Sequence, residues 1–261
     1  MVRVYAMYFS PTGTTEKIVT CIADSLSEEQ AKRYDFTLPA VRGKKASFGA
    51  DDIVVFGVPV YAGRVPNVLL KYLNTVEGGG AKAVPVVLYG NRNYDDALIE
   101  LCHILEEDGF DTIAAGAFVG EHSFSRKLAA GRPDEKDIEF AKDFASKIDI
   151  TKTGPVKVKG EDPIRGYYQP QDRHGNPINI LKVKPKTSDA CVKCGLCARV
   201  CPMGSISPED VTQFTGICIK CGACVKKCPV GAKYYDDAGY EYHKTELEEV
   251  YERRAEPEIF L

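Results

Sequence analysis

Apolar and polar positions follow two alternating patterns over the first 150 residues. Short runs rich in β-branched and aromatic residues predict strands that are buried on both faces, as in a parallel sheet. These runs are Val2–Phe9, Asp52–Gly57, Ala83–Tyr89 and Thr112–Val119, with a shorter, weaker run at Tyr34–Thr37. Between them, apolar residues recur three or four positions apart, which predicts amphipathic helices.

The helical positions alternate with the strands. They are Ile18, Ile22 and Leu26 in one stretch, Leu98, Leu101, Cys102 and Leu105 in another, and Asp134–Ile148 in a last helix. Strands and helices that alternate with short connections predict a doubly wound α/β sheet. In such a sheet a ligand binds at the carboxyl ends of the strands.

The pattern breaks after residue 150, where five prolines punctuate a stretch with few apolar residues: Pro155, Pro163, Pro170, Pro177 and Pro185. This composition predicts an extended linker that lies against a domain surface. A cysteine-rich segment follows, and then a charged, aromatic tail with a helix predicted at Lys244–Arg254. We therefore expect an α/β domain at 1–150, a linker at 151–187, a cysteine domain at 188–235 and a tail at 236–261.

Eight of the ten cysteines lie between Cys191 and Cys228, in two copies of one motif that begin 27 residues apart. Both copies read C-x2-C-x2-C-x3-C-P, a spacing that lets one short loop wrap three corners of a cubane of iron and sulfide. The glycine inside each copy lets the backbone approach the cluster closely. A dense block of this kind predicts metal binding, because disulfides would be spread along the chain. Structural zinc also uses C-x2-C pairs, but it normally takes two separated pairs.

Over about 45 residues this block resembles the bacterial two-[4Fe-4S] ferredoxin domain, a small α+β fold. In that domain the fourth cysteine of each motif serves the other cluster. The resemblance implies one ligand set of Cys191, Cys194, Cys197 and Cys228, and a second set of Cys218, Cys221, Cys224 and Cys201.

Hydroxyl-bearing residues and a glycine gather directly after the first predicted strand, in Ser10-Pro11-Thr12-Gly13-Thr14-Thr15. A helix is predicted behind this loop, so backbone N–H groups, the helix dipole and the hydroxyls would converge where a phosphate could sit. No lysine follows the glycine and no G-x-G-x-x-G follows the strand, which excludes a nucleotide-triphosphate loop and a dinucleotide fingerprint. An ordinary Ser/Thr helix cap is the alternative interpretation.

The loop looks like the flavodoxin phosphate loop, S-x-T-G-x-T, and this resemblance extends over residues 1–150. It implies five parallel strands in the order 2-1-3-4-5 and FMN as the ligand. By the same resemblance, the FMN phosphate is held by Ser10, Thr12, Gly13, Thr14 and Thr15. One side of the flavin ring would be flanked by Pro59, Val60, Tyr61, Ala62 and Gly63, and the other by Gly90, Asn91, Arg92 and Tyr94.

Nearly the full chain resembles the fused flavodoxin–ferredoxin family of anaerobic bacteria and archaea. It departs from that pattern in lacking tryptophan and in placing Arg64 and Arg92 where many flavodoxins carry acidic residues. A guanidinium beside the ring would stabilise an anionic reduced flavin and raise its potential. A salt-bridged or solvated surface role for both arginines is the alternative.

Few other residues suggest chemistry. His122 follows the fifth predicted strand and is the only candidate for proton delivery to the flavin. Cys21 and Cys102 lie on apolar helix faces and are interpreted as buried packing thiols. Four lysines beside the clusters could steer an acidic redox partner, or serve solubility: Lys193, Lys220, Lys226 and Lys227.

Charge and hydropathy exclude two classes of partner. The formal net charge is −3 and the pI about 5.9, with no long basic run, so nucleic acid and anionic membrane are poor candidates. No apolar run approaches the length that spans a bilayer, and we expect a cytoplasmic protein.

The expected function is electron transfer between two [4Fe-4S] clusters and FMN, linking a ferredoxin-type chain to another carrier or a reductase. The alternative is an FMN-dependent reductase of a small quinone-, nitro- or enone-like substrate, fed by its own clusters. The sequence leaves open the direction of electron flow and whether the chain forms a homo-oligomer.

Overall fold

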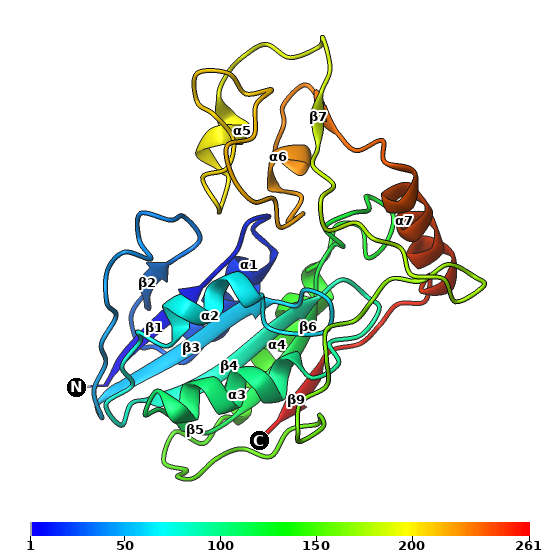
Figure 1. Cartoon of the computed structure of the whole chain (residues 1–261). Coiled ribbons are helices and arrows are strands. Elements are labelled where there is room, and N and C mark those ends of the chain that lie inside the picture. The colour runs from blue at the N-terminus through cyan, green and yellow to red at the C-terminus, as the bar shows by residue number, and fades with distance from the viewer. Residues whose placement is uncertain (1) are drawn as a thin grey trace.

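A mostly parallel sheet forms the centre of the computed structural model, which describes residues 2–261 (Figure 1). Met1, where the expected N-terminal domain starts, lies outside the described residues. The strands of this sheet are β1 (Arg3–Tyr8), β2 (Lys32–Asp35), β3 (Asp52–Pro59), β4 (Lys82–Tyr89), β5 (Asp111–Thr112), β6 (Ala115–Val119) and β9 (Glu258–Phe260). They run in the order β2-β1-β3-β4-β6-β9, and β5 pairs with β4. The predicted order 2-1-3-4-5 is confirmed, with β6 as the fifth parallel strand.

Helices cover both faces of the sheet (Figure 1). They are α1 (Thr14–Ser25) and α4 (Glu135–Lys147) on one face, and α2 (Asn67–Leu73) and α3 (Ala97–Glu107) on the other. Each face has its own core because successive strand residues point to opposite sides. On β1, Ala6 joins the core under α1, whereas Met7 joins the core under α3.

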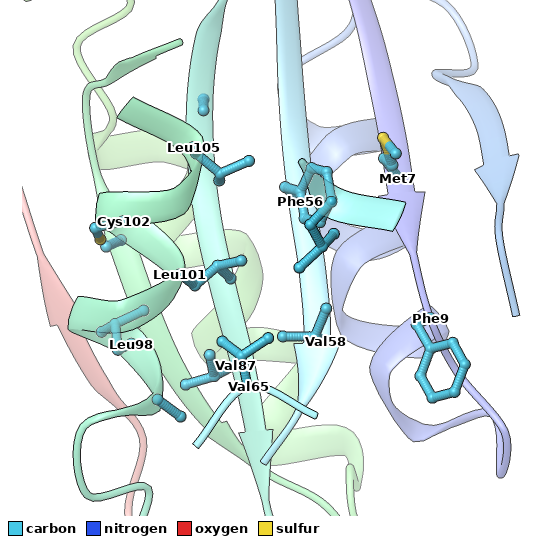
Figure 2. Packing of buried hydrophobic residues seen from close by; sticks show 14 of the residues in the cluster. Met7, Phe9, Phe56, Val58, Val65, Val87, Leu98, Leu101, Cys102 and Leu105 are labelled. Atoms are coloured by element: carbon cyan, nitrogen blue, oxygen red, sulfur yellow. The ribbon is translucent and has the colours of Figure 1, made fainter. Parts of the chain in front are cut away.

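The core under α3 is built from four strands, β1, β3, β4 and β6, and from the helices α2 and α3. Figure 2 shows Met7 and Phe56 of neighbouring strands in the same apolar layer as Leu98 and Leu105 of α3. Cys102 belongs to this layer and is 2% exposed, as expected of a packing thiol. Because this core and its counterpart hold both helix layers on the sheet, the strand ends form a firm edge for a site.

The strand predicted at Thr112–Val119 is broken into β5 and β6, so the prediction of one continuous strand is wrong. Its neighbour β4 carries Pro85 at the break, between Ala83, which pairs with β5, and Val86, which pairs with β6. Proline has no N–H and cannot donate the hydrogen bond that a continuous ladder needs there.

The C-terminal tail returns to the sheet, which the sequence did not predict. α7 spans Ala238–Val250 and therefore begins and ends earlier than the helix predicted at Lys244–Arg254. It begins earlier because the Asp237 carboxylate caps its first turn, accepting the Tyr240 N–H at 2.9 Å. The chain beyond α7 leads to β9, which pairs antiparallel with β6. Helix α2 also has no counterpart among the predicted helices.

The cysteine-rich segment forms a small domain beyond one end of the sheet (Figure 1). It contains α5 (Leu196–Arg199), α6 (Ala223–Lys226) and the paired strands β7 (Lys186–Thr187) and β8 (Lys233–Tyr234). Residues 151–185, all of them described, run without helix or strand between the two parts. No helix within residues 2–261 is both long and apolar enough to cross a bilayer.

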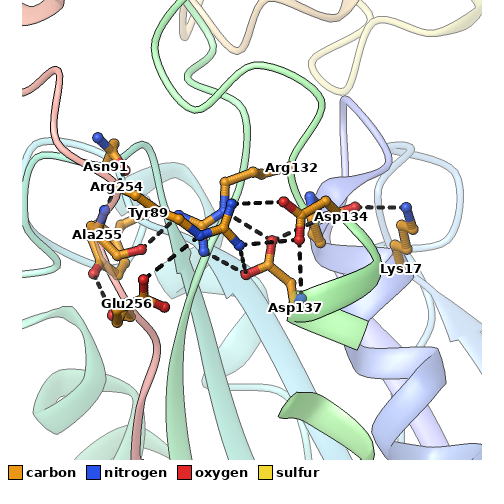
Figure 3. A network of polar contacts seen from close by, with 10 residues as sticks. Lys17, Tyr89, Asn91, Arg132, Asp134, Asp137, Arg254, Ala255 and Glu256 are labelled. Atoms are coloured by element: carbon orange, nitrogen blue, oxygen red, sulfur yellow. Dashed lines mark hydrogen bonds and ion pairs between the residues drawn. The ribbon is translucent and has the colours of Figure 1, made fainter. Parts of the chain in front are cut away.

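A buried ion pair ties the tail to the sheet domain (Figure 3). The Arg132 guanidinium donates to both carboxylate oxygens of Asp137, and these side chains are 4% and 1% exposed. It also donates to the backbone carbonyl of Ala255 in the tail, at 2.6 Å. The Asp137 carboxylate in turn accepts the N–H of Asp134 in the capping box that begins α4. Because both charges are out of water, each depends on the other.

Replacing Arg132 by methionine should destabilise the protein by about 3–5 kcal/mol, because the buried Asp137 carboxylate loses its main charged partner and keeps only Arg254, at 3.4 Å. The control is Arg33→Met, which removes an exposed pair with Asp24 and should cost at most about 1 kcal/mol. Urea unfolding of anaerobically prepared protein, followed by far-ultraviolet circular dichroism, measures both. Equal losses in the two variants would contradict the importance assigned to the buried pair.

Candidate functional site

The loop between β1 and α1 brings its hydroxyl groups to the carboxyl end of the sheet. Gly13 has φ +94°, a left-handed conformation that glycine adopts without strain, and it turns the chain into α1. The Ser10 hydroxyl accepts the Glu16 N–H at 2.9 Å, so Ser10 braces the loop. The Thr12 and Thr14 hydroxyls share a long hydrogen bond of 3.4 Å.

The threonines line a hollow of about 450 Å³, which we call the strand-end hollow. Its wall consists of Pro11, Thr12, Thr14, Thr15, Pro59, Val60, Tyr61, Leu88, Tyr89, Gly90, Gly120, Glu121, His122, Ser123 and Cys221. Most of these residues follow the carboxyl ends of β1, β3, β4 and β6, where a doubly wound sheet binds its ligand.

Half of the predicted flavin-site residues lie on this wall. They are Thr12, Thr14, Thr15, Pro59, Val60, Tyr61 and Gly90. The others lie outside it: Ser10, Gly13, Ala62, Gly63, Asn91, Arg92 and Tyr94. Ser10 and Gly13 belong to the loop between β1 and α1, whose threonines do line the hollow. The structure therefore differs from the prediction mainly in the segments after β3 and β4.

The tail occupies the segment after β4. The Asn91 side-chain amide donates to the Arg253 carbonyl at 2.6 Å, and its oxygen accepts the Ala255 N–H at 3.1 Å. The Tyr94 hydroxyl donates to the Glu258 carboxylate at 2.9 Å. The polar groups of Asn91 and Tyr94 are therefore engaged by the tail.

Arg64 and Arg92 are both salt-bridged. Arg64 pairs through two nitrogens with the Glu100 carboxylate, at 2.7 Å each, and Arg92 pairs with Asp95. A linker tyrosine ring also covers each guanidinium, with ring centres at 4.9 and 4.2 Å. Both arginines therefore have the salt-bridged role that the sequence left open as the alternative to a position beside the flavin ring.

His122 stands on the wall beside Gly90, where a Cβ would lie only 2.3 Å from the imidazole Cδ2. The His122 Nδ1 accepts the Phe124 N–H at 3.1 Å, which leaves the hydrogen of the neutral ring on Nε2. Burial, helped by the nearby charge of Lys226, lowers the pKa of His122 to about 3. The ring is therefore neutral at pH 7 and offers a hydrogen bond from Nε2.

Four cysteines line a second hollow of about 330 Å³, which we call the cysteine hollow. Cys201 comes from the first motif, whereas Cys218, Cys221 and Cys224 come from the second. Apolar side chains that include Ile206, Phe214 and Ile217, together with Tyr235, complete its wall. The remaining motif cysteines lie outside this wall; they are Cys191, Cys194, Cys197 and Cys228. Of these four, Cys194 is exposed.

The donor chemistry fits iron–sulfur clusters. The Ser205 N–H donates to the Cys201 sulfur at 3.3 Å, and the Ala232 N–H donates to the Cys228 sulfur at 3.2 Å. Such bonds stabilise thiolates and occur at the same place in both motifs. Burial raises the pKa of the Cys221 thiol, so a cation must offset the cost of its thiolate form. Within residues 2–261 no three His, Cys, Asp or Glu side chains converge on a single metal ion. The four ligands of an iron–sulfur cubane stand further apart than the ligands of one ion.

The two hollows meet at Cys221, which lines both. Close contacts hold the second motif there. A Cβ on Gly222 would lie 2.5 Å from the Ser123 carbonyl oxygen, so the two backbones nearly touch. The Lys226 ammonium, on a side chain that is 11% exposed, pairs with the Glu121 carboxylate. The small domain is thus docked on the strand ends by its second motif.

Two family models match the sequence: a flavodoxin domain at residues 5–81 and a 4Fe-4S dicluster domain at residues 190–233. The chain joins a flavodoxin domain to a 4Fe-4S dicluster domain. This combination is that of a fused flavodoxin–ferredoxin protein, and the predicted fold class is confirmed. The flavodoxin domain implies FMN, the dicluster domain implies iron–sulfur clusters, and together they indicate an iron–sulfur flavoprotein of electron transfer.

Three flavodoxins are among the solved structures similar to this chain. One from the domain Archaea is 14% identical, covering 56% of this chain and 94% of that one, with a TM-score of 0.38. The flavodoxin of Streptococcus pneumonia TIGR4 is 20% identical, covering 56% and 97%, with a TM-score of 0.39. Oxidised Flavodoxin 2 from Bacillus cereus is 19% identical, covering 56% and 96%, with a TM-score of 0.39. No curated protein sequence matches this chain.

Several wall residues of the strand-end hollow were not predicted. They are Pro11, Leu88, Tyr89, Gly120 and Cys221. Gly120 directly follows β6, so the rule that ligands bind at strand ends could have found it. Cys221 could not have been found in this way, because its place on the wall depends on how the two domains dock.

Proposed function

We propose that the protein carries electrons between two [4Fe-4S] clusters in its dicluster domain and FMN in the strand-end hollow. It would link a ferredoxin-type one-electron carrier to another carrier or a reductase. When bound, FMN exchanges one or two electrons and each cluster exchanges one.

The position of Cys221 is the observation that carries this proposal. Cys221 is 8% exposed and lines the strand-end hollow and the cysteine hollow alike. A cluster held by Cys221 would lie at the wall of the flavin site. This neighbourhood supports electron transfer within one chain.

The cluster at this wall is assigned to Cys201, Cys218, Cys221 and Cys224, and the second cluster to Cys191, Cys194, Cys197 and Cys228. The joint lining of one hollow by Cys201 and the second motif supports this crossed assignment. The ligands of the cluster at this wall include the buried Cys221 and Cys224, whereas those of the other include the exposed Cys194.

In the flavodoxin domain, Thr12, Thr14 and Thr15 are assigned to the FMN phosphate, together with the backbone N–H groups that begin α1. Tyr61 lies against the second motif, where burial raises the pKa of its phenol well above the usual value and keeps it neutral. The neutral His122 offers its Nε2 hydrogen to the flavin ring, so we assign it hydrogen bonding in place of proton delivery.

Replacing Thr12 by valine should weaken FMN binding by on the order of tenfold or more, because a hydroxyl donor to a charged phosphate is lost. Thr20→Val is the matched control, since the Thr20 hydroxyl bonds only carbonyls within α1, and FMN affinity should not change. Titration of flavin fluorescence measures affinity, and the iron content should stay constant. Unchanged affinity in the Thr12 variant would remove the phosphate-loop assignment.

The crossed ligand sets are tested by Cys201→Ala beside Cys228→Ala. Under anaerobic native conditions, the Cys201 variant should expose Cys218 to alkylation while Cys191 stays protected, and the Cys228 variant should give the reverse. Mass spectrometry of the labelled peptides maps the protection. If the Cys201 variant exposes Cys191 and spares Cys218, each motif serves its own cluster.

The proposed function is tested by mixing the reduced, anaerobic protein with two kinds of acceptor. One set is a ferredoxin or a cytochrome, and the other is quinones, nitro compounds and enones. We expect fast transfer to the protein carriers and slow turnover of every small molecule. Saturable turnover of one small molecule would instead favour the FMN-dependent reductase.

A further inference from the structure

The two cysteine motifs have the same backbone shape. Lys193 and Lys220 have φ +54° and +55°, and Gly195 and Gly222 have φ +72° and +76°. Each glycine begins a four-residue helix, α5 in the first motif and α6 in the second. A surface formed by one motif therefore has a counterpart of similar shape on the other.

The surface of the second motif is used inside the protein. The missing side chain of Gly222 lets the Ser123 carbonyl approach, and Lys226 pairs with Glu121. The Lys226 ammonium also donates to the Ser125 carbonyl at 2.7 Å. A carboxylate on the flavodoxin domain thus recognises a cation one helical turn beyond the glycine.

The equivalent surface of the first motif is open. A Cβ on Gly195 would meet only the Arg199 Nη1, at 3.0 Å, and no atom of the flavodoxin domain. Arg199 occupies the position of Lys226, is exposed, and donates to the Cys194 carbonyl at 2.9 Å. Within residues 2–261 it forms no ion pair.

Exposed cations and apolar side chains flank, along the chain, the cysteines assigned to the second cluster, which we call the outer set: Cys191, Cys194, Cys197 and Cys228. Lys193 and Lys227, each next to a cysteine of the outer set, are exposed and unpaired within the described chain, although Asp210 lies near Lys193. Val192 and Val230 are 62% and 44% exposed. Residues 188–235 contain six Lys or Arg against three Asp or Glu, whereas the whole chain has net charge −3.

Two of the four lysines beside the cluster cysteines are held by contacts within the protein and are not available for a partner. Lys226 is held by Glu121, and the Lys220 ammonium donates to the Leu181 and Cys218 carbonyls at 3.2 Å each. The cations left for a partner are therefore Lys193, Arg199 and Lys227, each within two residues of a cysteine of the outer set.

We propose that this open surface docks an acidic one-electron carrier protein, with a carboxylate of the carrier pairing with Arg199 as Glu121 pairs with Lys226. The proposal rests on the proposed function and adds the place and charge of the partner. Each encounter oxidises one protein by one electron and reduces the other by one, and no bond or proton needs to move. The outer cluster would exchange with the carrier and the Cys221 cluster with the flavin.

Charge reversal tests the surface. Arg199→Glu and Lys227→Glu should each lower the association rate with a small acidic ferredoxin by about tenfold at low salt, and the difference should fade as salt screens it. Lys142→Glu is the control, because it makes the same charge change at an exposed, unpaired lysine on α4. Stopped-flow reduction gives the rate, and titration with redox-inactive gallium-substituted ferredoxin gives binding without electron transfer.

Iron and flavin contents of each variant are measured first. Lys227→Glu is included because Arg199 donates to the Cys194 carbonyl, so Arg199→Glu by itself does not separate a lost docking contact from a disturbed cluster. If all three variants slow association equally, only net charge matters and the surface is wrong. If wild type exchanges electrons with the ferredoxin but neither Arg199→Glu nor Lys227→Glu is slower, the docking proposal fails while the proposed function survives. If chemically reduced wild type exchanges with no protein carrier, the proposed function itself fails.

Discussion

The close contact between the second cysteine motif and the strand ends is the constraint on which the site depends. Gly222 has no side chain, so the loop after β6 approaches its backbone directly. Lys226 is nearly removed from water and needs the Glu121 carboxylate, since a buried cation without a partner is costly. On the other side of the motif pair, the Arg42 guanidinium donates to the carbonyl that follows Cys201. These anchors come from two loops of the flavodoxin domain, the one after β6 and the one after β2, and together keep Cys221 at the wall.

The tail and the linker explain why that wall differs from the one implied by resemblance. Asn91 uses its amide hydrogens and its oxygen to hold the tail, and Tyr94 binds Glu258, the first residue of β9. A side chain whose donors and acceptors are already paired gains little by turning to a ligand. The linker similarly covers Arg64 and Arg92. The remaining sides of the hollow are then supplied by the loop after β6 and by the dicluster domain.

Sequence reasoning succeeded where the signal is local. The strands are compact apolar runs, and the cysteine spacing directly encodes a cluster loop, so the strands and the 4Fe-4S domain were predictable. The sheet order followed from the resemblance to flavodoxins. Pro85 could have indicated the broken strand, because its missing N–H is visible in the sequence. The antiparallel β9 and the place of Cys221 depend on contacts between residues more than one hundred positions apart, and no periodicity reports those. For the same reason, the sequence did not distinguish Lys226 from the other lysines beside the clusters.

Docking one copy of a duplicated motif makes the two copies unequal. Before docking, the surfaces at Gly195 and Gly222 present similar backbones and a cation at the same offset. Covalent attachment gives the flavodoxin domain a high effective concentration, so it occupies one surface permanently. An external carrier is not covalently attached and must find the other surface by diffusion. Long-range attraction between opposite charges raises the rate of this encounter. The exposed cations Arg199 and Lys227 suit that transient contact, because screened surface pairs are weak enough to release the carrier after transfer.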